Sequence, residues 1–383
     1  MRFRLHSSFA CRVLSAACCA SLVAGLISTL VYGEEGAKAA SSSQGRLSEQ
    51  VVGKAIEFLR QKGQAEDGSF SKQSGPAVTA LVATAVLRHG RSPDDPLVAK
   101  ALDYVKKFVH EDGGIYDEGS KVQNYETSLG LMCFVEANRD GRYDKLIKNA
   151  EKFLKDLQWD GKEGHDESSF NYGGAGYGGH KRPDLSNTTF FLDALKAAGN
   201  GPDDEAVKKA LVFVSRCQNL ESDHNTTPFP AKNPDGGFYY TPAAGGNSQA
   251  GETDEGGLRS YASMTYAGLK SMIFAGVGPD DPRVKAAVSW LQKHYDLDSN
   301  PGMGDAGLYY YYQTFAKALD AFGHDTFEDA DGKKHDWRQE LIAELAGRQQ
   351  ADGSWINSNS RWREGDPNLV TGYALLALAY CRK

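Results

Sequence analysis

Two kinds of apolar periodicity alternate along most of this chain, and this alternation constrains the fold more than any other feature. Six segments carry apolar residues at helical spacing with lysine and glutamate opposite, the pattern of helices with one solvated face. They span residues 47–63, 96–109, 142–158, 202–218, 282–295 and 335–350. Each is followed by a segment that is apolar on nearly every side, at 76–90, 124–138, 185–199, 263–276, 311–323 and 368–381. Because a helix without a polar face must be enclosed by others, we expect the second set to lie inside the first.

The strict alternation predicts an all-α fold, a single α/α toroid of six inner and six outer helices. Every inner segment has a threonine near its start, so we expect the inner helices to be parallel, with their N-termini on one rim. These residues are Thr79, Thr127, Thr188, Thr265, Thr314 and Thr371. An open solenoid is the structural alternative. Closure is favoured because six pairs suffice for a ring and neither end of the series is polar enough to be a cap.

The turns between outer and inner segments also repeat. Most contain Asp-Gly, which suits a tight turn, at 64–70, 111–116, 233–240 and 349–355. The third turn, 159–184, is much longer, and a second long glycine-rich segment precedes the fourth inner helix. Long loops in a compact domain usually carry function.

The first 33 residues have a different character. Arg2, Arg4 and Arg12 precede an apolar run at 13–31, and "VYG" before Glu34 suits a cleavage site. This pattern predicts an export signal, with an uncleaved membrane anchor as the alternative. Residues 34–45 are small, polar and aperiodic, so they are expected to form a flexible linker before a domain at 46–383. The protein is therefore expected to be periplasmic or extracellular, with membrane association through its N-terminal segment left open.

Composition narrows the class of partner. A chain of 383 residues with 40% hydrophobic content can bury a large core, and its net charge of −7 gives no indication of a nucleic-acid partner. Outside the leader, Cys133, Cys217 and Cys381 are widely spaced on apolar segments, which predicts buried thiols and neither a disulfide framework nor a metal site. Nothing in the sequence indicates a cofactor.

The last turn carries the pattern Gln-x-x-Asp-Gly-Ser-Trp from Gln349 to Trp355, with a weaker copy at 64–70. Together with the paired helices, it resembles the terpenoid cyclase and protein prenyltransferase superfamily over roughly residues 46–383. The resemblance implies a toroid that binds or transforms an isoprenoid in its central cavity.

Squalene-hopene type cyclases carry an Asp-x-Asp-Asp-Thr motif whose middle Asp protonates the polyene. Aligned through Thr188, this chain keeps the first acid as Asp184 but has Ser186 and Asn187 in place of the other two. A serine is too weak an acid to protonate an alkene. The prenyltransferase zinc ligands are also incomplete, because no Cys follows Asp254 and Gln313 stands where a His is expected.

If the ring closes, the starts of the inner helices surround one cavity, and candidate site residues follow. The proton-handling candidates are Asp184, Glu126 and Asp254. Asp184 is also a good helix cap, whereas burial of Glu126 inside a helix would raise its pKa. The ligand-binding candidates come from helix starts and long loops: Asn187, His180, Arg182, Arg259, Tyr261, Tyr311, Tyr312, Gln313, Trp362 and Asp366. For the tyrosines, ordinary aromatic core is the alternative interpretation.

Three functions remain open at this point. The first is an exported squalene-cyclase-like toroid that takes an isoprenoid. The second is an exported polysaccharide lyase or hydrolase with an α/α toroid fold, and the third is a noncatalytic binding toroid of the cell envelope. The cavity discriminates between them, because sugars need an open groove with polar walls and isoprenoids need a deep apolar pocket.

Overall fold

The computed structural model describes residues 45–178 and 182–382, which leaves the predicted leader and nearly all of the predicted linker outside the described residues. The chain divides into a short unit, Met1–Glu49, and a compact unit, Gln50–Lys383. In the short unit, residues 45–49 are helical. Within the described residues, no helix combines the length and apolarity that a membrane crossing requires.

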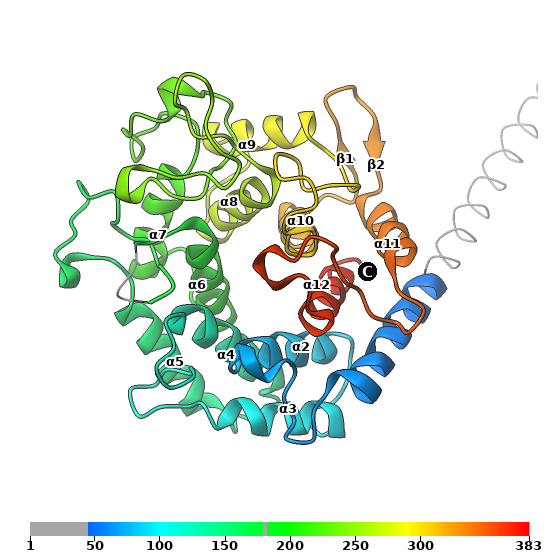
Figure 1. Ribbon diagram of the computed structural model, residues 1–383. Helices are drawn as coiled ribbons and strands as arrows, with labels where there is room; N and C mark the ends of the chain where they lie inside the picture. Colours follow the sequence, from blue (N-terminus) through cyan, green and yellow to red (C-terminus); the bar gives the residue numbers. More distant parts are fainter. Residues whose placement is uncertain (1–44, 179–181, 383) are drawn as a thin grey trace, which may run out of the picture. The chain divides into compact units, whose positions relative to one another are not determined.

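Six helices with mostly buried side chains form the inner ring of the compact unit. They are α2 (Ala77–Arg88), α4 (Gln123–Ala137), α6 (Leu185–Ala197), α8 (Ala262–Phe274), α10 (Leu308–Phe322) and α12 (Pro367–Ala379). Each packs against the next, and α12 packs against α2, so the ring is closed (Figure 1). The prediction of an all-α toroid is confirmed, and the open solenoid is excluded.

The outer layer consists of residues 50–58 with a π-helical turn, η1 (Leu59–Gly63), and five further helices. These are α3 (Pro96–Lys106), α5 (Asp144–Asp156), α7 (Glu205–Arg216), α9 (Pro282–Lys293) and α11 (Trp337–Arg348). In each Pro-Asp-Asp sequence the second Asp caps the helix that follows. These capping residues are Asp95, Asp204 and Asp281. A hairpin of β1 (Phe327–Glu328) and β2 (Lys334–His335) precedes α11, with Phe327 opposite His335.

The recurrent threonine joins each inner helix to the turn before it. Thr79 Oγ1 accepts a hydrogen bond from Phe70 N at 2.9 Å and donates to Phe70 O at 3.2 Å. Four other threonines accept a turn N–H in the same way, from Ile115, Ala175, Phe238 and Trp355. The sequence repeat therefore reports a structural bond that fixes where each of these inner helices starts.

The fifth repeat departs from this pattern. Thr314 donates to the carbonyls of Tyr310 and Tyr311 within its own helix. Thr314 is the seventh residue of α10, whereas the other repeat threonines are the third, fourth or fifth residues of their helices. Thr314 therefore lies two to four residues further along its helix than its counterparts.

A glutamine at each of four turns braces the outer layer. Gln349 Nε2 donates to Gly353 O and to Val51 O, both at 2.9 Å, which ties the last turn to the first outer helix of the unit. Gln64, Gln158 and Gln218 make the same pair of bonds to their own turn and to the next outer helix. Gly353 has φ +94°, and a Cβ there would lie 2.3 Å from Lys54 O, so only glycine fits this contact.

Candidate functional site

A cavity of ≈ 510 Å³ opens at the rim where the inner helices begin. This volume lies within the range of about 300–1,000 Å³ that is typical of small-molecule sites. Every inner helix contributes from its first two turns, through Val78, Glu126, Asn187, Met264, Tyr310 and Leu369 among others. The shared rim confirms that the N-termini of the inner helices face one space.

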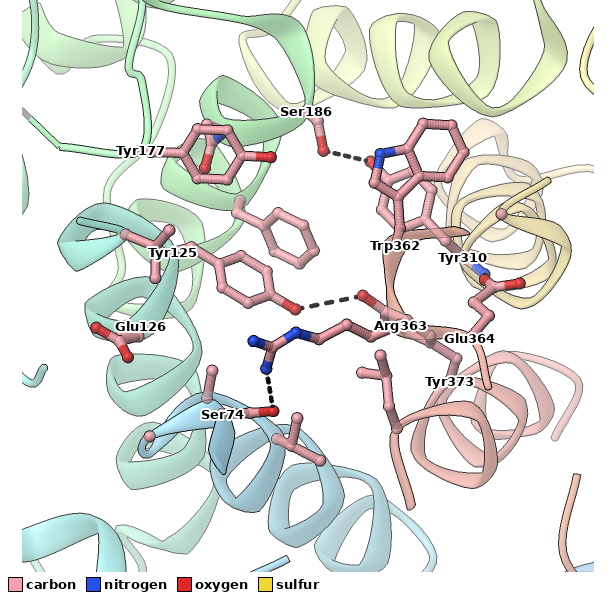
Figure 2. A pocket seen from close by; sticks show the side chains of 18 of the residues that line it. Ser74, Tyr125, Glu126, Tyr177, Ser186, Tyr310, Trp362, Arg363, Glu364 and Tyr373 are labelled. Carbon is pink, nitrogen blue, oxygen red and sulfur yellow. Dashed lines mark hydrogen bonds between the residues drawn. The ribbon is translucent and has the colours of Figure 1, made fainter. Parts of the chain in front are cut away.

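Four aromatic side chains form what we call the aromatic girdle: Tyr125 of α4, Phe190 of α6, Tyr310 of α10 and Tyr373 of α12. Ring centroids lie 5.0 Å apart for Tyr125 and Phe190, 6.1 Å for Phe190 and Tyr310, and 6.0 Å for Tyr310 and Tyr373. A contact of 3.3 Å between the hydroxyls of Tyr373 and Tyr125 completes the circle (Figure 2). The girdle gives the cavity an aromatic wall, in which three of the four rings carry a hydroxyl. Phe190 and Tyr373 also line a second cavity of ≈ 20 Å³, whose other wall residues lie deeper in the ring.

Glu126 is a carboxylate of the cavity wall whose pKa is strongly raised by burial. It lies in the first turn of α4, is 3% exposed and lines the cavity. Burial raises the pKa of Glu126 to about 7, although contacts with the Ser120 hydroxyl and the Asp117 backbone lower it in part. Gly75 makes room for it, because a Cβ at that position would lie 2.6 Å from Glu126 Oε1. Glu126 therefore exchanges its proton near neutral pH.

Asp184 acts as a helix cap. Its Oδ1 accepts from Asn187 N and its Oδ2 from Asn187 Nδ2, both at 2.9 Å, and the side chain is fully buried. Burial raises the pKa of Asp184 to about 6, against the lowering effect of these hydrogen bonds. Asn187 stands between this carboxylate and the cavity, which it lines. A role in catalysis for Asp184 stays a prediction.

Ser186 occupies the position where the cyclase motif has its catalytic Asp, and it does line the cavity. Its Oγ lies 3.1 Å from the hydroxyl oxygen of Tyr310. The place of the strong acid is thus taken by a pair of neutral hydroxyls.

Of the other candidates, the structure brings Tyr261 and Trp362 to the cavity together with Glu126 and Asn187. It places Tyr311 and Tyr312 elsewhere, because their hydroxyls donate to Asp296 O and Leu297 O. Gln313 lines the second, smaller cavity. The deeper position of Thr314 in α10 explains this difference, since alignment through the threonines assumed that every helix starts at the same level.

The remaining candidates lie in loops or at a cap. Asp254 and Arg259 are exposed in the loop before α8, and Arg259 Nε donates to Glu252 O. The Arg182 guanidinium lies 5.5 Å from the centre of the Tyr240 ring. Asp366 caps α12 by accepting from Asn368 N. His180 lies outside the described residues.

A short segment crosses the cavity mouth. Arg361 donates to Gln249 Oε1 at 2.6 Å, and Arg363 donates to Ser74 Oγ on the loop before α2 (Figure 2). Trp362 lies between these two arginines in the sequence. Trp362 and Arg363 have φ +55° and +66°, a conformation that is strained for residues other than glycine. Trp362 is 45% exposed and its ring packs on Gly307.

The helix N-termini at the mouth do not form an open anion site. Asp184 caps α6 and Asp366 caps α12. Glu364 accepts from Tyr309 N and Tyr310 N at the start of α10, and burial raises its pKa. Three of the six helix dipoles are thus neutralised by carboxylates of the chain itself.

Sequence reasoning missed two groups of residues. Phe190 and Tyr373 of the girdle both lie two residues after the repeat threonine, a shared position that would have revealed them. The second group is a buried ion triad, in which Asp193 contacts Lys270 and Lys317, each at 2.6 Å. Burial alone would raise the pKa of Asp193, but the two ammonium groups outweigh it and lower that pKa. The sequence signal that could have revealed this triad is the presence of charged residues within segments that are otherwise apolar.

The described residues contain no group of three or more His, Cys, Asp or Glu side chains arranged to hold a metal ion. The zinc set of the prenyltransferases does not fit either, because Asp254 is exposed on a loop and Gln313 faces the smaller cavity.

Comparison with known proteins agrees with this architecture. The family model described as the squalene-hopene cyclase C-terminal domain matches residues 65–241. Among solved structures, the type II terpene cyclase MstE from Scytonema is 13% identical with a TM-score of 0.52, and the match covers 87% of this chain and 97% of that one. No curated protein matches this chain in sequence.

Two sugar-active proteins share the fold to a similar degree. A polysaccharide lyase is 8% identical with a TM-score of 0.51, covering 88% of this chain and 97% of its own. A glycosyl hydrolase of family 88 from Bacteroides vulgatus is 11% identical with a TM-score of 0.51, covering 87% and 98%. At these identities the likeness concerns the fold alone. The family-model match over residues 65–241 agrees with the resemblance to the terpenoid cyclase superfamily that the sequence indicated.

Proposed function

We propose that this protein binds or transforms an isoprenoid in its central cavity, with Glu126 as the proton-handling residue. The observation that carries the proposal is the aromatic girdle, which closes the deep part of a ≈ 510 Å³ cavity beside a buried carboxylate. Aromatic walls suit a branched hydrocarbon chain. The match of residues 65–241 to the squalene-hopene cyclase C-terminal domain supports the same ligand class.

The kind of chemistry follows from the pKa of Glu126. A carboxylic acid whose pKa is raised to about 7 holds its proton more tightly, so it is a weaker acid toward an alkene than an ordinary Asp. With Ser186 in the acid position, proton-initiated cyclisation by the family mechanism is not supported. Glu126 is better matched to taking up or returning a proton at a polar end of the ligand near neutral pH.

The test is to incubate the purified protein with a lipid extract and to identify by mass spectrometry what co-purifies or is converted. Glu126→Gln and Asp184→Asn should reduce binding or conversion, whereas Glu111→Gln, at an exposed acid that does not line the cavity, should not. Unchanged binding and unchanged product in both of the first two variants would count against the proposal.

A polysaccharide lyase or hydrolase is the second candidate. It is favoured by the exposed Trp362 beside Arg363 at the mouth and by the fold shared with a lyase and a glycosyl hydrolase. Incubation with a panel of uronate-containing and neutral oligosaccharides would decide, because both enzymes produce new reducing ends but only a lyase also produces an unsaturated uronate at the non-reducing end. A noncatalytic toroid is expected to have a filled centre and carboxylates of ordinary pKa, and the open cavity and the raised pKa of Glu126 argue against it.

We also propose that the protein is exported. The support is the basic and apolar leader of the first 33 residues. Fractionation of cells that express the full chain, with N-terminal sequencing of the product, tests both export and cleavage.

A further inference from the structure

Arg363 is the only positively charged residue in the lining of the central cavity, as far as the structure describes the chain. Figure 2 shows its side chain reaching from the segment before α12 toward Tyr125. Burial raises the pKa of Tyr125 to about 12, and the positive charge of Arg363 opposes this rise, so the two groups are neighbours. Because Arg363 is exposed and Tyr125 is half-buried, a molecule that enters the cavity can reach both.

Most of the hydrogen-bonding capacity of Arg363 is unused. A guanidinium carries five N–H donors in a planar fork. Within the described residues, the side chain makes one hydrogen bond, from Nη1 to Ser74 Oγ, and it forms no ion pair. The bond to Ser74 fixes the direction of the fork and leaves its other N–H groups available.

The two buried acids of the lining are bonded elsewhere. Glu364 is 1% exposed, and its carboxylate accepts hydrogen bonds from Asn357 Nδ2 and from two backbone N–H groups at the start of α10. Glu126 is 3% exposed, and its carboxylate contacts the Ser120 hydroxyl on the loop before α4. Arg363 is therefore left without a buried counter-charge.

The other two acids of the lining, Asp117 and Glu118, are exposed on the loop before α4. Salt screens the interactions of such exposed groups over about 8–10 Å, so they offset the charge of Arg363 only weakly. They do bear on which anion can enter, because they repel a multiply charged group more than a singly charged one. The cavity therefore favours a ligand with a single negative charge.

The backbone of this segment is shaped to hold the guanidinium in place. Trp362 and Arg363 both have positive φ. Such conformations persist only where the surrounding structure imposes them, and they cluster at functional sites. Here Glu364 anchors the segment to α10, and the ring of Trp362 packs on Gly307. Strain that holds an unpaired guanidinium beside an aromatic wall indicates that Arg363 binds a ligand.

We propose that the ligand carries a carboxylate, to which Arg363 donates its free N–H groups and Tyr125 donates its hydroxyl hydrogen. A guanidinium and a carboxylate match in a planar geometry with two hydrogen bonds. Tyr125 can donate to the ligand because its hydroxyl oxygen, 3.3 Å from that of Tyr373, can accept from Tyr373. The proposal rests on the proposed function for the hydrocarbon part of the ligand, and it narrows the substrate class to an isoprenoid acid.

Four probes with the same hydrocarbon chain and different heads test this: geranylgeranoic acid, its methyl ester, geranylgeraniol and geranylgeranyl diphosphate. Calorimetry at pH 7, where a carboxylic acid is ionised, measures their affinities for the purified protein. We expect the acid to bind about tenfold or more tighter than the ester and the alcohol, because only the acid forms charge-assisted hydrogen bonds. The diphosphate should bind more weakly than the acid, because Asp117 and Glu118 repel its additional charge.

Variants within one segment identify the residue responsible. Arg363→Gln should abolish the advantage of the acid while the affinity for the ester stays within about twofold, which also shows that the variant is folded. Arg361→Gln is the matched control and should keep the advantage, because it removes the same charge at a residue that does not line the cavity. Arg363→Lys should keep only part of the advantage, because an ammonium group lacks the planar fork.

Each outcome separates the two proposals. If the acid and the ester bind equally, if the diphosphate binds best, or if Arg363→Gln keeps the advantage of the acid, the carboxylate proposal is overturned while isoprenoid binding stands. An equal loss in Arg361→Gln would also overturn it, since the effect would then belong to the overall charge of the segment. If none of the four probes binds, both proposals fail.

Discussion

Ser186 Oγ lies 3.1 Å from the hydroxyl oxygen of Tyr310 at the wall of the central cavity. The pair joins α6 to α10 across the ring, at the position where related cyclases have a carboxylic acid. The toroid and its cavity are thus retained while the proton donor of the family mechanism is replaced by a structural hydrogen bond.

This bond predicts a measurable coupling. Ser186→Ala and Tyr310→Phe should each destabilise the fold, and together they should cost less than the sum of the two. We expect a coupling of about 0.5–1.5 kcal/mol from a double-mutant cycle in urea unfolding, because either single change leaves the other hydroxyl without this partner. Strict additivity would mean that the two hydroxyls do not interact.

Stability should depend on the ionisation of Glu126. Its pKa is raised from 4.5 to about 7, so between these values the folded protein keeps a proton that the unfolded chain has lost. The contribution of this group to the free energy of unfolding therefore falls as pH rises through that window. Relative to the wild type, Glu126→Gln should gain about 2 kcal/mol between pH 5 and pH 8, less than the full shift implies because of solvent in the cavity. Urea titrations at both pH values measure this gain, and the same change in Glu118→Gln would contradict its assignment to Glu126.

The ion triad should be sensitive to the loss of its acid. Asp193→Asn leaves Lys270 and Lys317 buried without their counter-charge and is expected to cost about 3–5 kcal/mol in the free energy of unfolding. Asp156→Asn, which breaks exposed pairs with Lys152 and Lys162, should cost less than about 1 kcal/mol. Replacing Asp193 by Leu together with both lysines by Met should recover most of the loss. Equal effects of the two single variants would show that the triad is not buried as described.

The contact between the last turn and the first outer helix should tolerate no side chain. Gly353 and Gly199 have almost the same backbone angle, φ +94° and +95°, but only Gly353 is crowded, by Lys54 O. Both alanine variants incur the cost of the left-handed conformation, about 1–2 kcal/mol. Gly353→Ala should lose about 1–3 kcal/mol more because of the overlap. Thermal unfolding of the two variants makes the comparison, and equal losses would argue against the close approach.

The fold was accessible from sequence because its determinants are local. The apolar periodicity separated inner from outer helices, and the repeat threonine marked a real bond in five of the six turns. Alignment through that residue failed for α10, where Thr314 bonds within its own helix and the turn before it differs.

The site was only partly accessible, because it depends on how side chains from separate helices converge. Glu126 and Asn187 were found since each precedes a repeat threonine and thus faces inward near the rim. The aromatic girdle was missed because its members come from four helices and become a unit only when the ring closes. Tyr311 and Tyr312 were proposed because they belong to the run of four tyrosines at 309–312, but the direction of their hydroxyls depends on the loop at 296–297.

The central claim is that the cavity bounded by the aromatic girdle is an isoprenoid-binding site, and filling that cavity tests it most directly. Met264 lies in the first turn of α8, is 2% exposed and lines the cavity, so Met264→Trp should occupy ligand space. Calorimetric binding of geranylgeraniol is compared with the wild type and with Lys148→Trp, which adds the same side chain on the exposed face of α5. The account predicts a loss of affinity of about tenfold or more in Met264→Trp alone, with cooperative unfolding retained. Undiminished binding in that variant would contradict it.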